Sequence, residues 1–363
     1  MKLQKISISN FRNINELEYQ PKPGLNILMG DNAQGKTNIL EAIFVVATAS
    51  SFRTNNDRLL VQQGKEKYGL KATHMVDKRA VNTEIEYHWE RGKQLRINSK
   101  KSSQNNPNRL RVVDFTPDDL YLVKGSPSRR RKYIDYILKE VTTEYRLLLD
   151  NYYKILRRRN EALRKNEVNG KSYRVISELF AEYAAKIIKN RINLVKLLDK
   201  ITSHTYLQLS QDQEEIKIKY ALSFPFQEDK INYITLNENL SKYLEENREN
   251  ELRRKSTLVG PHLDDINIYL QNQHARLFAS QGQQRNIAVS LKIAQVLAFK
   301  EIIGFYPLLL LDEVLAEFDD PRKARLLDYI NRAEYQSILT SVVNDLLYPY
   351  QERISLVKSG HIL

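Results

Sequence analysis

The stretch GDNAQGKT, Gly30–Thr37, constrains the fold of this 363-residue chain more than any other stretch. An apolar run, residues 25–29, precedes it, and an apolar helical segment, residues 37–46, follows it. The sequence therefore predicts a strand, a glycine-rich turn and a helix in succession. Because the backbone N–H groups of such a turn can surround phosphate oxygens, the pattern G-x-x-x-x-G-K-T in this context predicts a phosphate-binding loop.

Two side chains of the loop have direct chemical roles in this prediction. Lys36 would reach the β- and γ-phosphates of a nucleotide, and the Thr37 hydroxyl would hold Mg²⁺. The guanine-reading patterns N-K-x-D and T-K-x-D are absent from the chain, which favours ATP over GTP. The predicted ATP-binding residues are Gly30, Asp31, Asn32, Ala33, Gln34, Gly35, Lys36 and Thr37.

A second motif, PLLLLDE at Pro307–Glu313, supplies the carboxylates that a phosphate loop needs. A short apolar run that ends in charged residues is typical of a strand buried in a parallel sheet. Asp312 would then lie beside the Mg²⁺, and Glu313 would accept a proton from the attacking water or orient that water. Alone, the run fits a strand with a solvated acidic turn better. Together with the phosphate loop it favours a hydrolytic site.

The two motifs lie about 270 residues apart. The intervening chain is first β-rich, then has apolar residues at helical spacing from Lys124 to about Lys200, and returns to β/α character after Thr257. This order predicts one α/β domain with an inserted helical arm. We expect residues 1–115 and 256–363 to form the ATPase lobe and residues 116–255 to form the arm.

The stretch SQGQQR, Ser280–Arg285, begins another predicted helix. Ser280 and Gln283 satisfy the capping-box pattern S-x-x-Q, so one interpretation is purely structural. Gly282 costs a helix up to about 1 kcal/mol relative to alanine, and a glycine in such a place often lets another group approach the backbone. A helix start also offers free N–H groups and partial positive charge to an anion. Capping and phosphate binding are compatible interpretations.

SQGQQR resembles the signature motif L-S-G-G-Q of ABC-type ATPases, in the divergent form of chromosome-maintenance and repair members. In that family the signature of one subunit contacts the γ-phosphate on another subunit. The resemblance implies an α/β fold, an ABC-type P-loop ATPase head with an inserted α-helical arm (lobe II), and an ATP-dependent homodimer. It assigns partner-ATP contacts to Ser280, Gln281, Gly282 and Gln283.

LAEFDD, Leu315–Asp320, resembles the D-loop of the same family, with Asp319 in the aspartate position and Ala316 where serine is usual. The family's Q-loop glutamine and H-loop histidine are hard to place. The chain has no glutamine between Gln104 and Gln208 and no histidine between His274 and His361. The resemblance therefore implies that other residues take these roles, or that hydrolysis is slow.

Further stretches resemble the RecF family of bacterial recombination-repair ATPases, in the family's order and nearly from end to end. They are NFRN (10–13), SSFRT (50–54), FTPDDLYLVKGSPSRRRKYID (115–135), RRRNEAL (157–163) and LVGPHLDD (258–265). Leu263 departs from the family's usual arginine. The resemblance implies a DNA-stimulated ATPase that acts on duplex DNA beside single-strand gaps, helps to load recombinase, and has RecR and RecO as partners.

Positive charge is concentrated in the predicted arm. From Lys124 to Lys165 there are 13 Lys and Arg against five Asp and Glu. One interpretation is a solvated helical face, and the other is contact with the phosphate backbone of DNA. The candidate DNA-binding residues are Arg129, Arg130, Arg131, Lys132, Arg157, Arg158 and Arg159.

Composition limits the alternatives. The net charge of +13 is compatible with a polyanionic partner, and the lack of cysteine excludes disulfides. The N-terminus lacks the apolar segment of a signal peptide, and no run approaches the roughly 18 apolar residues of a membrane span, so we expect a cytoplasmic protein with no membrane partner. Two other functions stay open, namely the ATPase subunit of a transporter and a non-hydrolysing nucleotide-gated clamp.

Overall fold

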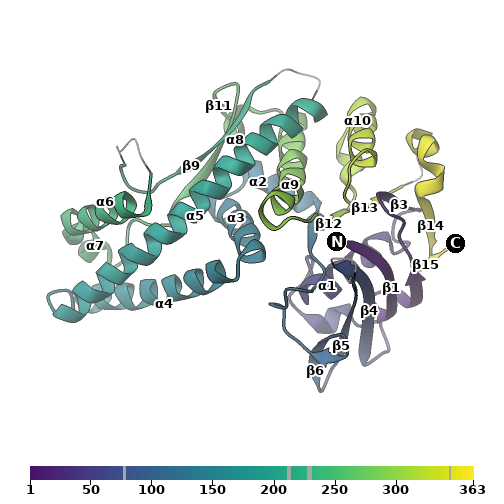
Figure 1. Cartoon of the computed structure of the whole chain (residues 1–363), viewed down its shortest axis with the longest axis horizontal. Coiled ribbons are helices and arrows are strands. Elements are labelled where there is room, and N and C mark those ends of the chain that lie inside the picture. The colour runs from purple at the N-terminus through teal and green to yellow at the C-terminus, as the bar shows by residue number, and fades with distance from the viewer. Residues whose placement is uncertain (77–78, 211–213, 227–230, 343–344) are drawn as a thin grey trace. The chain divides into compact units, whose positions relative to one another are not determined.

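The computed structural model describes residues 1–76, 79–210, 214–226, 231–342 and 345–363, and it divides into two compact units (Figure 1). The first unit contains residues 1–119, a short stretch that begins at Gln208, and residues 281–363. The second contains Leu120–Leu207 and the described residues from there to Ser280. No helix in these ranges is both long enough and apolar enough to cross a membrane.

The boundaries of the arm differ from those predicted. Residues 256–280 belong to the second unit and not to the ATPase lobe, and residues 116–119 belong to the first unit. The reason is strand pairing, because β10 (Asp265–Leu270) pairs antiparallel with β9 (Ile216–Ala221) along its whole length. The chain therefore returns to the first unit just before the predicted signature helix.

A parallel sheet forms the centre of the first unit. Its strands, in order, are β14 (Ile354–Lys358), β3 (Leu25–Met29), β13 (Ser337–Ser341), β12 (Leu308–Leu311) and β8 (Val112–Phe115), with β15 (His361–Ile362) antiparallel at the edge. All residues of β12 and β13 are buried. Continuous apolar runs such as LLLL suit a strand that is covered on both faces, as the sequence predicted.

An antiparallel sheet covers one side of α1 (Lys36–Thr48). Its strands, in order, are β2 (Ile14–Tyr19), β1 (Lys2–Phe11), β4 (Lys67–Val76), β5 (Arg79–His88), β6 (Gly92–Ile97) and β7 (Lys100–Lys101). Burial alternates along β4 because one face of this sheet packs on the core and the other faces solvent. Ile39, Leu40 and Ile43 of α1 join residues of both sheets in one core cluster, which fixes the helix that follows the phosphate loop.

The remaining helices of the first unit are α9 (Gln281–Ile303) and α10 (Asp320–Asn331). Short 3-10 helices occupy several connections: η1 (Asp57–Leu60), η2 (Pro117–Leu120), η3 (Val314–Glu317) and η4 (Asp345–Arg353). The helix and strand predictions around Pro307–Glu313 and Pro321 are confirmed.

The second unit is mainly helical, as predicted. Its helices are α2 (Tyr121–Lys124), α3 (Pro127–Val141), α4 (Thr143–Lys165), α5 (Lys171–Leu209), α6 (Tyr233–Glu246), α7 (Arg248–Arg254) and α8 (Ala275–Phe278). A small sheet in the order β11 (Gln273–His274), β10 and β9 accompanies them. α4 ends at Lys165, and the next residue, Asn166, caps it with a left-handed backbone (φ 61°) and an N–H directed at the Ala162 and Leu163 carbonyls.

Candidate nucleotide-binding site

The two motif glycines of the phosphate loop are required by close contacts. A Cβ atom on Gly30 would lie 2.3 Å from the Val357 carbonyl oxygen, which no side chain could tolerate. Gly35 has φ +106°, and a Cβ atom there would also meet the Asn13 side chain at 3.1 Å. The tight turn from β3 into α1 is therefore available only to glycine at these positions.

The C-terminal hairpin supports the loop from outside. The Ser359 N–H donates to Gln34 Oε1 at 2.7 Å, and the Gly360 N–H donates to the Gln34 carbonyl at 2.8 Å. Gln34 was predicted to bind ATP from its place in the motif. In the structure its side-chain oxygen anchors the loop to the turn between β14 and β15, and its contact with ATP stays a prediction.

Lys36 lies inside the loop. Its Nζ donates to the Gly30 and Asp31 carbonyls, each at 2.7 Å, and the residue is only 5% exposed. Burial lowers the pKa of Lys36, while the nearby charges of Glu313, Asp312 and Asp31 act in the opposite direction. The ammonium group is thus within electrostatic reach of both predicted carboxylates.

Thr37 and Asp312 meet directly, although 275 positions separate them in the sequence. The Thr37 hydroxyl, at the start of α1, donates to Asp312 Oδ1 at 2.9 Å, at the end of β12. Burial raises the pKa of Asp312, and the hydrogen bonds from Thr37 and Thr340 lower it. The predicted partnership of phosphate loop and aspartate is present in the geometry.

The donor set suits a hard cation. A hydroxyl and a carboxylate together present oxygen ligands, which Mg²⁺ prefers, and Mg²⁺ commonly takes its other ligands from phosphates and water. Within the described ranges no group of three or more His, Cys, Asp or Glu side chains could hold a metal. Thr37 and Asp312 therefore fit a cation that a bound nucleotide helps to coordinate.

Glu313 follows Asp312 in an unusual backbone conformation. Its φ is +51°, in the left-handed region that a non-glycine residue rarely adopts. Its N–H donates to the Thr340 hydroxyl at 2.9 Å, and its side chain is exposed. The carboxylate is thus accessible to solvent at the end of β12, as a group that accepts a proton from water must be.

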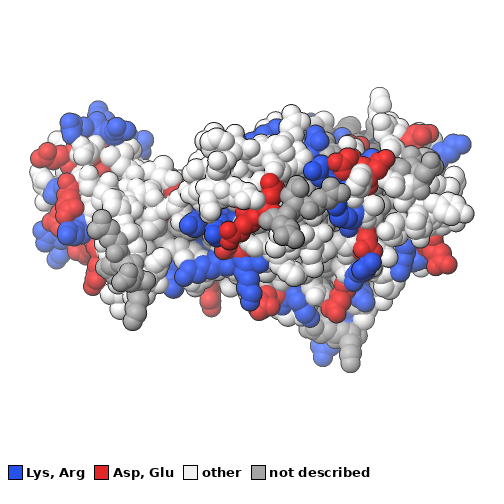
Figure 2. All heavy atoms as spheres, turned by 90° about the horizontal axis from the view of Figure 1, so that it is seen from above, with Lys and Arg blue, Asp and Glu red and all other residues white. Residues whose placement is uncertain are grey.

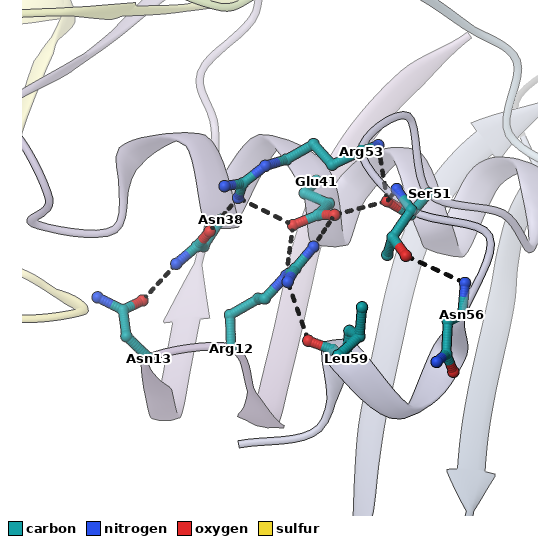
Figure 3. A network of polar contacts seen from close by, with 9 residues as sticks. Arg12, Asn13, Asn38, Glu41, Ser51, Arg53, Asn56 and Leu59 are labelled. Carbon is teal, nitrogen blue, oxygen red and sulfur yellow. Dashed lines mark hydrogen bonds and ion pairs between the residues drawn. The ribbon is translucent and has the colours of Figure 1, made fainter. Parts of the chain in front are cut away.

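A buried carboxylate that the sequence analysis missed organises the surroundings of the loop (Figure 3). Glu41, fully buried on α1, accepts two hydrogen bonds from Arg12, at 2.9 and 2.7 Å, and one from the Ser51 hydroxyl at 2.6 Å. Arg53 lies 3.4 Å from the same carboxylate. Arg12 and Arg53 belong to the stretches NFRN and SSFRT, so the fold brings these two stretches together around one carboxylate.

The network continues to the phosphate loop. Arg53 donates to Asn38 Oδ1 at 3.0 Å, and Asn38 donates to Asn13 Oδ1 at 2.7 Å (Figure 3). Asn13 is the side chain that packs on Gly35. Arg53 is 46% exposed, and its charge is among those that lower the pKa of Asp312. A half-exposed arginine therefore stands near the predicted metal ligand.

The signature and D-loop residues share one arginine. Asp319 caps α10 by accepting from the Arg322 N–H at 3.0 Å, and it also accepts from Arg322 Nη1 at 2.7 Å. A Cβ atom on Gly282 would lie 3.1 Å from that Nη1. The group that approaches the backbone of Gly282 is therefore Arg322. Ser280 immediately precedes α9, and its predicted capping box stays a prediction.

The structure corrects two of the DNA-binding candidates. Arg159 is 1% exposed, and it donates to both Glu251 carboxylate oxygens, at 2.6 and 3.1 Å, and to Thr257 at 2.7 Å. Arg130 is 6% exposed and forms two hydrogen bonds to Asp265, each of 2.8 Å. Both form ion pairs inside the second unit, because these positions of α3 and α4 face its interior.

The other candidates are divided between surface and partial burial. Arg131 is half-buried and donates to the Asp264 carbonyl at 2.7 Å. The exposed candidates are Arg129, Lys132, Arg157 and Arg158. Leu263, which stands where the related family usually has arginine, is 46% exposed and so is not used in the core.

Comparison with known proteins matches this geometry to one family. A family model described as the RecF/RecN/SMC N terminal domain matches residues 2–361. The DNA replication and repair protein RecF of Streptococcus suis is 34% identical over 369 residues, covering 100% of this chain and 99% of its own. The RecF protein of Streptococcus thermophilus is 37% identical over 368 residues, covering 100% and 98%.

A solved structure agrees along the whole chain. It is described as the recombination mediator protein RecF with ATP in the RecFOR pathway, and it matches with a TM-score of 0.84 at 30% identity, covering 100% of this chain and 98% of that chain. These matches confirm the RecF resemblance and the predicted fold class, an α/β ABC-type ATPase head with an inserted helical arm.

Proposed function

The chain belongs to the RecF family of DNA replication and repair proteins, and from that premise we propose that it is a slow, DNA-stimulated ATPase of recombinational repair. In this proposal the ATP-bound protein dimerises on duplex DNA beside a single-strand gap and helps to load recombinase. RecR and RecO are its proposed partners, since the similar solved structure is described within the RecFOR pathway.

The hydrogen bond between Thr37 and Asp312 carries the proposal, because it unites two motifs that are remote in the sequence. Lys36 lies near this pair, and the charges of Asp312 and Glu313 act to raise its pKa. A phosphate-binding turn, a lysine, a hydroxyl and two carboxylates are together the parts that hold and hydrolyse a nucleoside triphosphate. A phosphate-binding loop alone would bind phosphate without this arrangement.

Each residue then has a defined task in hydrolysis. On nucleotide binding, Lys36 exchanges its loop carbonyls for β- and γ-phosphate oxygens, and the loop N–H groups surround the phosphates. When bound, Mg²⁺ would supply positive charge that stabilises the transferring phosphoryl group. Glu313 accepts the proton of the attacking water. The signature of a second copy closes the site over the γ-phosphate.

The proposed DNA surface lies on the arm. Arg157 and Arg158 are exposed on α4, whereas Arg159 is not. Lys and Arg side chains, interspersed with Asp and Glu, lie at the left end of the molecule in Figure 2, where Figure 1 shows the turn between α4 and α5 and the short helix α7. Such contacts to phosphates are independent of sequence and weaken with salt.

The test is the mass of the protein in solution by light scattering, with ATP, with ADP and with a slowly hydrolysed ATP analogue. We expect a dimer with the analogue and a monomer with ADP. Lys36→Ala removes the cation fixed on the phosphates, and we expect it to abolish both analogue binding and dimerisation. Lys65→Ala removes an exposed lysine of the same unit and should leave both unchanged.

Two results would separate this proposal from its alternatives. A dimer that forms with ATP and never releases phosphate, with or without duplex DNA, would favour the non-hydrolysing clamp. A protein that stays monomeric with every nucleotide would contradict ATP-driven dimerisation. The transporter alternative is disfavoured, because the relatives that match the full length are named as DNA replication and repair proteins.

A further inference from the structure

Strand β13 lies between the two strands that carry the nucleotide motifs. It pairs in parallel with β3, which leads into the phosphate loop, and with β12, which leads to the two carboxylates. The Ser341 carbonyl at its end accepts from the Gly30 N–H at 3.3 Å. β13 is therefore placed to hold both motifs in a fixed relation.

Thr340, the residue before Ser341, is fully buried and uses its hydroxyl twice. The hydroxyl donates to Asp312 Oδ1 at 2.9 Å, and it accepts from the Glu313 N–H at 2.9 Å. One side chain thus fixes the carboxylate of the predicted metal ligand, Asp312, and the backbone of the predicted catalytic residue, Glu313. No sequence motif singled out this position.

The contact to Glu313 has a structural consequence. A non-glycine residue in the left-handed region costs free energy and persists only where its surroundings hold it. Glu313 has φ +51°, and the hydroxyl of Thr340 accepts its N–H. The direction in which the Glu313 carboxylate leaves the end of β12 therefore depends on Thr340.

The second contact of the Thr340 hydroxyl holds the carboxylate of Asp312. Asp312 Oδ1 accepts both the Thr340 and the Thr37 hydroxyls, each at 2.9 Å. Thr340 donates from β13, and Thr37 donates from α1. The carboxylate is held between a strand that lies in the sheet and the helix that follows the phosphate loop.

We propose that Thr340 is a positioning residue for ATP hydrolysis, which orients Glu313 toward the water and Asp312 toward Thr37. The proposal rests on the proposed ATPase function. Thr340 does not touch the phosphate loop in any described contact, so its effect acts through these two carboxylates. It should govern turnover and leave nucleotide affinity nearly unchanged.

The decisive variant is Thr340→Val, which keeps the size and branching of the side chain and removes the hydroxyl. The Glu313 N–H then loses its acceptor, and we expect kcat to fall roughly tenfold to a hundredfold. The KM for ATP should stay within about threefold, because the phosphate loop is unaltered. Thr340→Ser retains the hydroxyl, and we expect it to recover most of kcat.

Ser337→Ala is the matched control. Ser337 is also fully buried on β13, but its hydroxyl has no hydrogen-bond partner among the described residues. We expect this variant to keep wild-type kcat. A deuterium-exchange measurement without nucleotide adds a readout that does not need activity. The amide of Glu313 should exchange faster in Thr340→Val than in the wild type and Ser337→Ala.

The outcomes distinguish this proposal from the proposed function. If Glu313→Gln slows hydrolysis while Thr340→Val keeps wild-type kcat and exchange, the role of Thr340 is overturned and the ATPase function stands. If the wild type binds no ATP and releases no phosphate, both are overturned. If Thr340→Val fails to fold, Thr340→Ser and Thr340→Ala replace it. Equal kcat in these two variants would also overturn the proposal.

Discussion

The arginines that pair with buried or partly buried carboxylates differ in exposure between the two units. Near the phosphate loop, Arg12 and Arg53 share one buried carboxylate, Glu41, and Arg53 keeps nearly half of its side chain exposed. In the second unit Arg130, Arg159 and Arg191 each face a carboxylate and are almost wholly buried. The first arrangement leaves positive charge available to a ligand, and the second neutralises it inside the fold.

The difference shows that a run of basic residues in the sequence does not by itself form a basic surface in the fold. Arg157, Arg158 and Arg159 are consecutive on α4, and each step turns the side chain by about 100° around the helix. The third therefore points inward, where Glu251 meets it. A buried pair of this kind adds little stability compared with apolar packing, but removing one partner leaves an unpaired charge in the interior.

The largest expected effect is that of Arg159→Ala, which leaves Glu251 charged and without its partner. We expect a loss of about 3–5 kcal/mol in the free energy of unfolding, measured by urea denaturation. Arg158→Ala, at the next position, removes an exposed side chain and should change stability by less than about 0.5 kcal/mol. Equal losses in the two variants would contradict the contrast between inward and outward positions.

A smaller loss in the free energy of unfolding should follow when the pH is lowered. Burial lowers the pKa of His262 to about 4, and its Nδ1 lies 2.6 Å from the Tyr152 hydroxyl. The unfolded chain takes up this proton near pH 6.5, whereas the folded protein takes it up only near pH 4, so stability is lost as pH falls between these values. At pH 5 the histidine accounts for about 2 kcal/mol of that loss.

The measurement is the free energy of unfolding at pH 7 and pH 5. His262→Gln has no imidazole to titrate, so we expect it to lose about 2 kcal/mol less than the wild type between these pH values. His88→Gln, in the first unit, serves as the control for removing a histidine. Parallel losses in the wild type and His262→Gln would show that the buried imidazole has no such role.

The smallest effect concerns the outward arginines. Arg157→Ala with Arg158→Ala should remove two phosphate contacts, which flattens the slope of log affinity against log salt by roughly 1.8. The paired control, Lys65→Ala with Lys67→Ala, removes the same charge from exposed positions of the first unit. An unchanged slope for the arm variant would show that Arg157 and Arg158 lie on a solvated face and do not contact DNA phosphates.

Much of the first unit could be predicted from the sequence because its signals are local. The glycines of Gly30–Thr37, the apolar run before Asp312 and the helix after it each depend on neighbouring residues. The pairing of Thr37 with Asp312 followed from the known logic of such motifs and is present in the structure. The roles of Glu41 and Thr340 could not be predicted, because each depends on partners that only the folded sheet brings together.

The arm shows the limit more clearly. The sequence predicted its helices but could not tell which arginines face inward, since Glu251 and Asp265 lie some 92 and 135 positions from their partners. The return to the first unit was placed too early, at 256, because β10 has the same alternating pattern in either unit. Strand partners are chosen by tertiary contacts, which periodicity alone does not encode.

The central claim is that ATP joins two copies of the chain, with the phosphate loop of one and Ser280 of the other. Ser280→Asp tests it most directly, because aspartate caps a helix about as well as serine. A carboxylate about 4 Å from a γ-phosphate charge would cost roughly 4 kcal/mol at an effective dielectric constant of 20, enough to weaken dimerisation several-hundredfold. We predict a stable protein that binds ATP and stays monomeric in light scattering. A variant that dimerises with ATP like the wild type would contradict the claim and leave Ser280 as a helix cap.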